Sequence, residues 1–125
     1  MMKITTFNPQ IITTNADDIL PLFEELGFKI KHQQTGIGEL GIKSIVMEDA
    51  GGFKIDISEA EDLPKETITA IRMNVDDFEE AYRKLTANGF RNIYGVHSTN
   101  TASARSAIMV SKSGITINLI QHIRK

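Results

Sequence analysis

Polar side chains that are suited to ligand binding alternate with apolar ones along several stretches of this chain. Asp56 lies between Ile55 and Ile57, and Asn118 lies between Ile117 and Leu119. Such alternation predicts strands with one face on a core and one polar face. The predicted polar face also carries amide, hydroxyl and guanidinium groups: Asn8, Gln10, Arg72, Asn74 and Thr116. These groups suit a polar or anionic small molecule with Arg72 as its charge partner, although a solvated sheet face has the same pattern.

Asp56 is the acidic residue of this set. Its carboxylate could serve as a general base or accept a hydrogen bond from a ligand. It could equally pair with Arg72 or Lys54 and only satisfy a polar sheet face. The residues alone leave both interpretations open.

The three histidines are not spaced like a metal site. His32 falls in a predicted strand, His97 opens a loop and His122 lies in the C-terminal tail, so no two share a helix face or hairpin. The chain has no cysteine, which excludes thiolate ligands and disulfides. We interpret the histidines as surface or edge residues.

Several apolar side chains have two interpretations. Phe53 and Phe90 are expected in the core, and Tyr94 is open as a stacking residue. Met47 and Met109 are expected to fill the core. The polar loop at 97–104 is either a lid over the site or a mobile connector.

The chain contains an apparent repeat at an offset of 62 residues. KSIVMEDAGGFKIDIS from Lys43 aligns without a gap with RSAIMVSKSGITINLI from Arg105, so Ser44 falls on Ser106. Gly27-Phe28 falls on Gly89-Phe90 at the same offset. A fixed period of this length indicates a duplicated supersecondary unit, with a cleft between the halves as the natural site.

The predicted elements follow the order βαβββ twice. The first module (about 1–58) has a strand at 4–14, a helix from Asn15 to Gly27 and three further strands at 28–33, 42–48 and 53–58. The helix is expected to start at Asn15 and to bury a stripe of Ile19, Leu22, Phe23 and Leu26. An acidic linker spans 59–66.

The second module (67–125) has a strand at 67–75, a helix capped by Asp77, and strands at 90–96, 105–111 and 115–121. The expected class is α+β.

Composition bounds the partners of the chain. Its 125 residues suit one domain, and 41% are hydrophobic and 24% charged. The net charge of −2 argues against non-specific nucleic-acid binding, which needs a cationic face. No apolar run is long enough to span a membrane, and the first residues lack a leader pattern. We therefore expect a cytoplasmic protein with neither nucleic-acid nor membrane partners.

These features resemble the vicinal oxygen chelate superfamily. The resemblance is carried by a helix ending in LGF (Leu26 to Phe28), by VDDFEEAYRKLTANGF (Val75 to Phe90) and by the repeated strand order. The superfamily includes glyoxalase I, extradiol dioxygenases, methylmalonyl-CoA epimerase and bleomycin- and fosfomycin-resistance proteins. The resemblance implies one glyoxalase-like domain with a curved mixed sheet around a cleft and helices on its outer face. Pairing of two chains as a homodimer is also known for such modules.

The resemblance also implies four metal-ligand positions, and their residues depart from the family pattern. The first-strand positions, usually His, are Asn8 and Ala70, and the last-strand positions, often Glu, are Asp56 and Asn118. Alanine has no donor atom, and an amide is a poor ligand for a transition metal. We therefore expect no metal and no other cofactor.

The sequence thus favours metal-independent binding of a polar or anionic small molecule in the cleft. The predicted ligand-binding residues are Asn8, Gln10, Asp56, Ala70, Arg72, Asn74, Thr116 and Asn118. A metal-dependent lyase or dioxygenase-type enzyme is the first alternative. A degenerate module that serves only protein association is the second.

Overall fold

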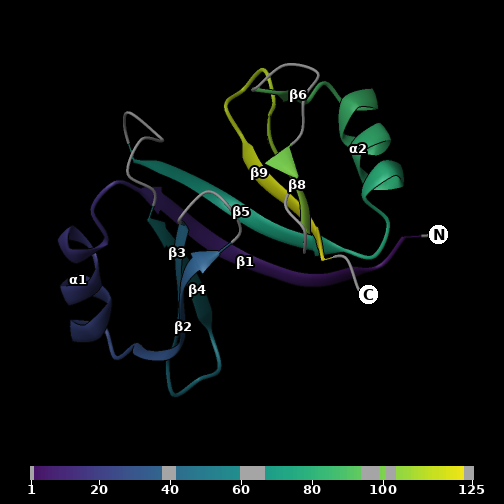
Figure 1. Cartoon of the computed structure of the whole chain (residues 1–125). Helices are drawn as coiled ribbons and strands as arrows, with labels where there is room; N and C mark the ends of the chain where they lie inside the picture. The colour runs from purple at the N-terminus through teal and green to yellow at the C-terminus, as the bar shows by residue number, and fades with distance from the viewer. Residues whose placement is uncertain (1, 38–41, 60–66, 94–98, 101–103, 123–125) are drawn as a thin grey trace. The chain divides into compact units, whose positions relative to one another are not determined.

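The structure is a computed structural model that describes residues 2–37, 42–59, 67–93, 99–100 and 104–122 (Figure 1). The chain divides into two compact units. Asn8–Thr69 form the first, here called the N-unit, and Met1–Phe7 with Ala70–Lys125 form the second, the C-unit. Each unit contains its own group of paired strands and one α-helix.

The N-unit has a four-stranded mixed sheet in the order β2-β3-β4-β1. Its elements are β1 (Ile4–Thr13, the second part of the strand), a 3-10 turn η1 (Ala16–Asp18), α1 (Leu20–Glu25), β2 (Lys29–Ile37), β3 (Ile42–Glu48) and β4 (Lys54–Glu59). Strand β1 runs parallel to β4, whereas β2 with β3 and β3 with β4 are antiparallel.

The C-unit sheet is also mixed. Its elements are β5 (Ile68–Val75, mostly in this unit), α2 (Phe78–Ala87), β6 (Arg91–Asn92), β7 (Thr99–Asn100), β8 (Ala104–Val110) and β9 (Thr116–His122). Strand β5 pairs in parallel with β9, β9 pairs antiparallel with β8, and the short β6 and β7 both pair with β8. The predicted α+β class with mixed sheet pairing is confirmed.

One face of each sheet carries a hydrophobic core. In the N-unit this core consists of Ile45, Met47, Ile55 and Ile57 with Ala16, and the half-buried Ile11, Ile19, Leu20, Phe23 and Phe28 pack against it. In the C-unit it consists of Met73, Val75, Phe78, Ala81, Ala107, Met109, Ile117 and Leu119. Met47 and Met109 are both fully buried, which confirms their predicted place in the core. The opposite, polar face of each sheet is therefore the one left for a site.

Helix α2 begins as its sequence predicts. The Asp77 carboxylate oxygen Oδ1 accepts a hydrogen bond from the Glu80 backbone N–H at 3.1 Å, and satisfies one of the free donors of the first turn. Ala81 is buried, and Tyr82 and Leu85 pack against the core. These three residues form the apolar stripe by which the helix packs on the C-unit core.

Helix α1 differs from its prediction. It spans only six residues, and Asn15 makes no side-chain capping bond. Pro21 explains the late start of the helix, because proline has no N–H to donate and its ring clashes with a preceding helical turn, so it is tolerated in the first turn and not in the interior. The predicted burial of Leu22 and Leu26 is wrong: these side chains are 47% and 61% exposed.

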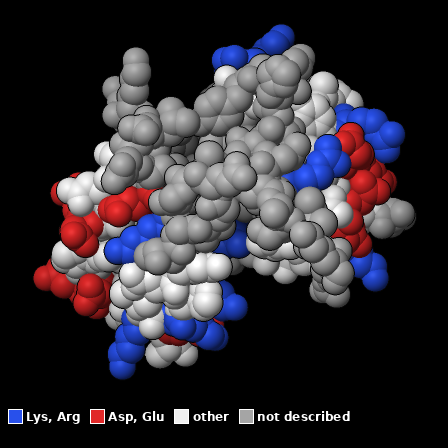
Figure 2. Space-filling view, viewed as in Figure 1, with Lys and Arg blue, Asp and Glu red and all other residues white. Residues whose placement is uncertain are grey.

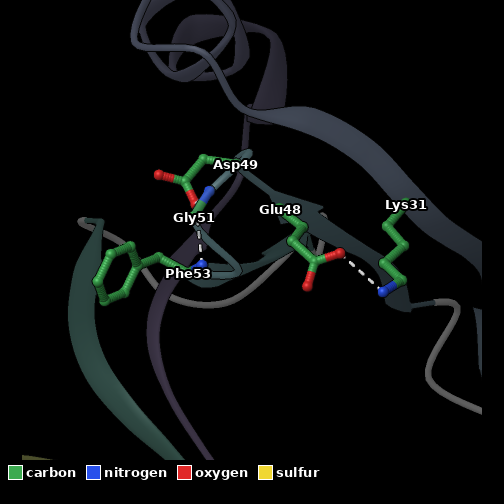
Figure 3. Close-up of polar contacts among 5 residues, drawn as sticks. All are labelled: Lys31, Glu48, Asp49, Gly51 and Phe53. Atoms are coloured by element: carbon green, nitrogen blue, oxygen red, sulfur yellow. Dashed lines mark hydrogen bonds and ion pairs between the residues drawn. The ribbon is translucent and has the colours of Figure 1, made fainter.

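Phe53 is also misplaced by the sequence pattern, since its side chain is 72% exposed. The turn between β3 and β4 holds it outside the strand alternation. Asp49 Oδ1 accepts hydrogen bonds from the backbone N–H groups of Gly51 at 3.0 Å and Phe53 at 2.8 Å (Figure 3). Gly52, between these two residues, has a φ of +87°, which glycine adopts without steric cost. Beside this turn, Lys31 pairs with Glu48 at 2.7 Å (Figure 3).

Other predicted boundaries shift by a few residues. Strand β2 continues to Ile37, four residues beyond its predicted end, and Glu59 belongs to β4 and not to the linker. Most of the predicted linker, Tyr94, His97 and most of the 97–104 loop lie outside the described residues. Within the described part of the chain, no helix is long and apolar enough to cross a membrane.

Candidate ligand-binding site

The polar face of the N-unit sheet brings together three of the predicted site residues. Gln10 on β1 is the direct neighbour of Asp56 on β4, and Asn8 lies two residues earlier on the same face of β1. Gln10 is 3% exposed and Asp56 is 1% exposed, so both polar groups are almost fully buried. Groups buried to this degree must be hydrogen-bonded.

Side-chain hydrogen bonds satisfy this face. Asn8 donates from Nδ2 to Asp56 Oδ2 at 3.0 Å, and Gln10 donates from Nε2 to the Ser58 hydroxyl at 2.9 Å. The Asn8 amide turns its nitrogen, the donor end of the group, toward the Asp56 oxygen. Ser58 follows Asp56 in the same alternation, but the sequence analysis did not name it among the site residues.

The other predicted site residues lie on the polar face of the C-unit sheet. Arg72 on β5 is the direct neighbour of Asn118 on β9, and Asn74 is the neighbour of Ile120. Arg72 donates from Nε to Asn74 Oδ1 at 3.2 Å, and Asn74 is 5% exposed. The remaining predicted residues lie on the same two strands and the same face by alternation: Ala70 and Thr116.

His122 is a further residue of this face. The sequence placed it in a tail, but β9 continues to His122, so the alternation of Thr116 and Asn118 extends to the imidazole. Partial burial and the positive charge of Arg72 lower the pKa of His122 below its ordinary value. Counting the alternation two steps beyond Asn118 would have found it.

The donor atoms at the four metal-ligand positions do not fit a transition-metal site. In the N-unit, the Asn8 amide nitrogen already occupies one oxygen of Asp56. In the C-unit, Ala70 has no donor and Asn118 offers an amide. Among the described residues, no group of three or more His, Cys, Asp and Glu side chains is arranged to hold a metal ion.

The chain has the vicinal oxygen chelate fold, since solved structures with that fold resemble it over nearly its whole length. Methylmalonyl-CoA epimerase from Mycobacterium tuberculosis has a TM-score of 0.63 at 17% identity, over 97% of this chain and 90% of that chain. A glyoxalase/bleomycin resistance protein/dioxygenase superfamily member from Vibrio splendidus has a TM-score of 0.58 at 14% identity, over 95% and 99%.

A variant of Streptomyces coelicolor methylmalonyl-CoA epimerase, solved in complex with 2-nitronate-propionyl-CoA, has a TM-score of 0.62 at 14% identity, over 98% of this chain and 100% of that chain. No protein-family model matches the chain, and no curated protein matches it. Identities this low show the fold, and the same fold carries many functions.

Proposed function

We propose that this protein binds a polar or anionic small molecule on the polar faces of its sheets without a resident transition metal. The observation that carries the proposal is the hydrogen bond from Asn8 to the buried Asp56 carboxylate. Asn8 and Asp56 are two of the positions to which the family resemblance assigns metal ligands, and here the Asn8 amide donates to the Asp56 carboxylate. An amide cannot replace imidazole in such a site.

Arg72 supports the anionic character of the ligand. Arg72 is a half-buried residue that donates to the Asn74 amide and is the strand neighbour of Asn118. Guanidinium groups bind carboxylates and phosphates through two parallel hydrogen bonds, and amides add donors without charge. A ligand with a carboxylate or phosphate group fits this chemistry better than a neutral one.

The structural neighbours favour small-molecule binding over protein association. One epimerase of this fold was solved with 2-nitronate-propionyl-CoA, so the fold accommodates such a ligand in that protein. The neighbours that are epimerases also keep an enzymatic alternative open for this chain. That alternative requires Asp56 to act as a base or a metal ligand.

A thermal-shift and calorimetric screen tests the proposal. Carboxylates, phosphate esters and thiol conjugates should stabilise the wild-type protein in the presence of EDTA. Arg72→Ala should weaken a hit about tenfold or more, since a charge-assisted hydrogen bond contributes about 1.5–3 kcal/mol. Arg91→Ala is the matched control, because Arg91 is an exposed arginine on β6 of the same unit.

Three outcomes would contradict the proposal. A hit that binds equally well to Arg72→Ala lies elsewhere on the protein. Binding that disappears in EDTA and returns with Ni²⁺ or Zn²⁺ favours the metal-dependent enzyme. No hit at all, together with a stable complex with another protein, favours the association module.

A further inference from the structure

The C-unit polar face ends in two basic side chains from neighbouring strands. The hydrogen bond from Arg72 Nε to Asn74 Oδ1 at 3.2 Å directs the arginine toward the C-terminal end of β5. Strands β5 and β9 are parallel, and Asn74 is paired with Ile120. The guanidinium of Arg72 therefore lies toward the row of Asn74 and Ile120, and His122 stands one step further on the same face of β9.

Within the described part of the chain, two other charged side chains near this end of the sheet, Asp76 and Arg105, contact other groups. Just beyond β5, the Asp76 carboxylate accepts a hydrogen bond from the Lys3 backbone N–H at 2.6 Å. From β8, Ala104 and Ser106 pair with His122 and Ile120 and bring no charge. Arg105 pairs with Gln121, so it lies on the opposite face, where it contacts Glu79 and the Phe78 ring. Arg72 is thus the cation that acts on the imidazole.

We propose that Arg72 and His122 together bind the oxyanion group of the ligand, a carboxylate, phosphate or sulfate, and that the affinity for this group rises as the pH falls. This inference rests on the proposed function and names the part of the ligand that the C-unit recognises. Asn74 and Asn118, on the same face, supply neutral polar groups beside the two basic ones.

The direction of the pH dependence follows from proton linkage. In the free protein, partial burial and Arg72 lower the pKa of His122. An oxyanion between the two groups offsets the Arg72 charge and accepts a hydrogen bond from the imidazolium, which raises that pKa in the complex. Binding therefore takes up a proton, and the affinity increases as the pH falls through the interval between the free and the bound pKa.

Sulfate is the probe for this test because its charge is constant between pH 5.5 and 8. Isothermal titration at constant ionic strength should give about threefold or more tighter sulfate binding at pH 5.5 than at pH 8, because proton uptake by His122 on binding favours the complex at the lower pH. In parallel, NMR titration of the His122 ring protons should show a higher pKa with saturating sulfate than without it.

Matched variants separate the two basic groups. His122→Gln should bind sulfate at pH 8 within about twofold of wild type but lose the tightening at pH 5.5. Arg72→Gln should weaken binding about tenfold or more at both pH values, because its charge does not titrate. His32→Gln is the control: it removes a histidine from β2 of the N-unit and should keep the full pH dependence.

Each contrary outcome overturns the inference. Sulfate binding that is independent of pH in wild type, or equally dependent in His122→Gln, removes His122 from the site. If carboxylate ligands bind through Arg72 but sulfate does not bind at either pH, this inference fails and the proposed function stands. If no ligand binding depends on Arg72, both fail.

Discussion

Phe78 donates its backbone N–H to Gln121 Oε1 at 2.7 Å, and so the first residue of α2 is tied to the end of β9. The side-chain amide of Gln121 also donates from Nε2 to the Asp76 carbonyl oxygen at 3.0 Å. Gln121 therefore satisfies one donor and one acceptor at the start of the helix. Its role is structural, and it fixes the end of the strand that carries His122.

Replacing Gln121 should destabilise the protein. Gln121→Ala removes both hydrogen bonds and leaves polar backbone groups unsatisfied, which costs about 1–3 kcal/mol. Urea denaturation measures the loss in the free energy of unfolding. Gln33→Ala, at an exposed glutamine on β2, is the control and should change stability by less than about 0.5 kcal/mol. Equal stability of the two variants would contradict this role.

The N-unit has a corresponding contact. Ala16 donates its backbone N–H to Glu59 Oε2 at 2.5 Å, and each of these residues lies 62 positions before its C-unit counterpart, Phe78 or Gln121. The duplication of the chain remains our proposal, and this pair of contacts supports it. The contact also explains how the chain enters α1 without a cap from Asn15.

Glu59 should accordingly matter for stability through its acceptor atom. We expect Glu59→Ala to lower the free energy of unfolding by about 1–3 kcal/mol, since a hydrogen bond to a charged group is lost. Glu59→Gln keeps an acceptor and should lose less than half of that amount. Thermal and urea denaturation of both variants test this. A loss in Glu59→Gln as large as in Glu59→Ala would show that the charge, and not the acceptor, is required.

Phe53 and Ile55, both predicted to be buried, should respond differently to mutation. Phe53→Ser should change stability by less than about 0.5 kcal/mol, because the ring is exposed. Ile55→Ala, at a side chain that is 6% exposed, should cost about 2–5 kcal/mol. Comparable losses at both positions, measured by urea denaturation, would contradict the exposed position of Phe53.

Stability should depend on pH through His122. Its pKa in the folded protein is lowered from the ordinary 6.5, so between the two values the unfolded chain binds more protons than the folded one. Stability should therefore decrease as the pH falls from above 6.5 through the folded pKa. His122→Gln should show a smaller decrease than wild type in urea denaturation at pH 5 and 7.5. An unchanged pH dependence in His122→Gln would contradict the lowered pKa.

Local signals in the sequence were sufficient for much of the fold. Asp77 was predicted to cap α2 because its partner is three residues away, and Met47 and Met109 were placed in the core by alternation. The errors arise where single side-chain contacts decide. Asn15 loses its capping role to Glu59, which is 43 residues away from Ala16 in the chain, and Asp49 holds Phe53 out of the alternation. Neither contact has a periodic signature.

The candidate site was predicted to a similar extent. Alternation assigned all six residues, Asn8, Gln10, Asp56, Arg72, Asn74 and Asn118, to one polar face. In the structure the first three lie together on the polar face of the N-unit strands, and the last three lie together on that of the C-unit strands. The predicted alternation ended before His122, because the basic sequence HIRK was interpreted as a tail. Which side chains touch one another, such as Asn8 and Asp56, depends on strand register, which no local pattern specifies.

We propose that the Asn8 amide, which donates to Asp56, leaves this polar face unsuited to a transition metal. Elemental analysis of the purified protein, after incubation with Ni²⁺ or Zn²⁺ and desalting, tests it most directly when wild type is compared with Asp56→Ala. We predict far less than one ion per chain in both proteins. One ion per wild-type chain that is lost in Asp56→Ala would contradict the claim.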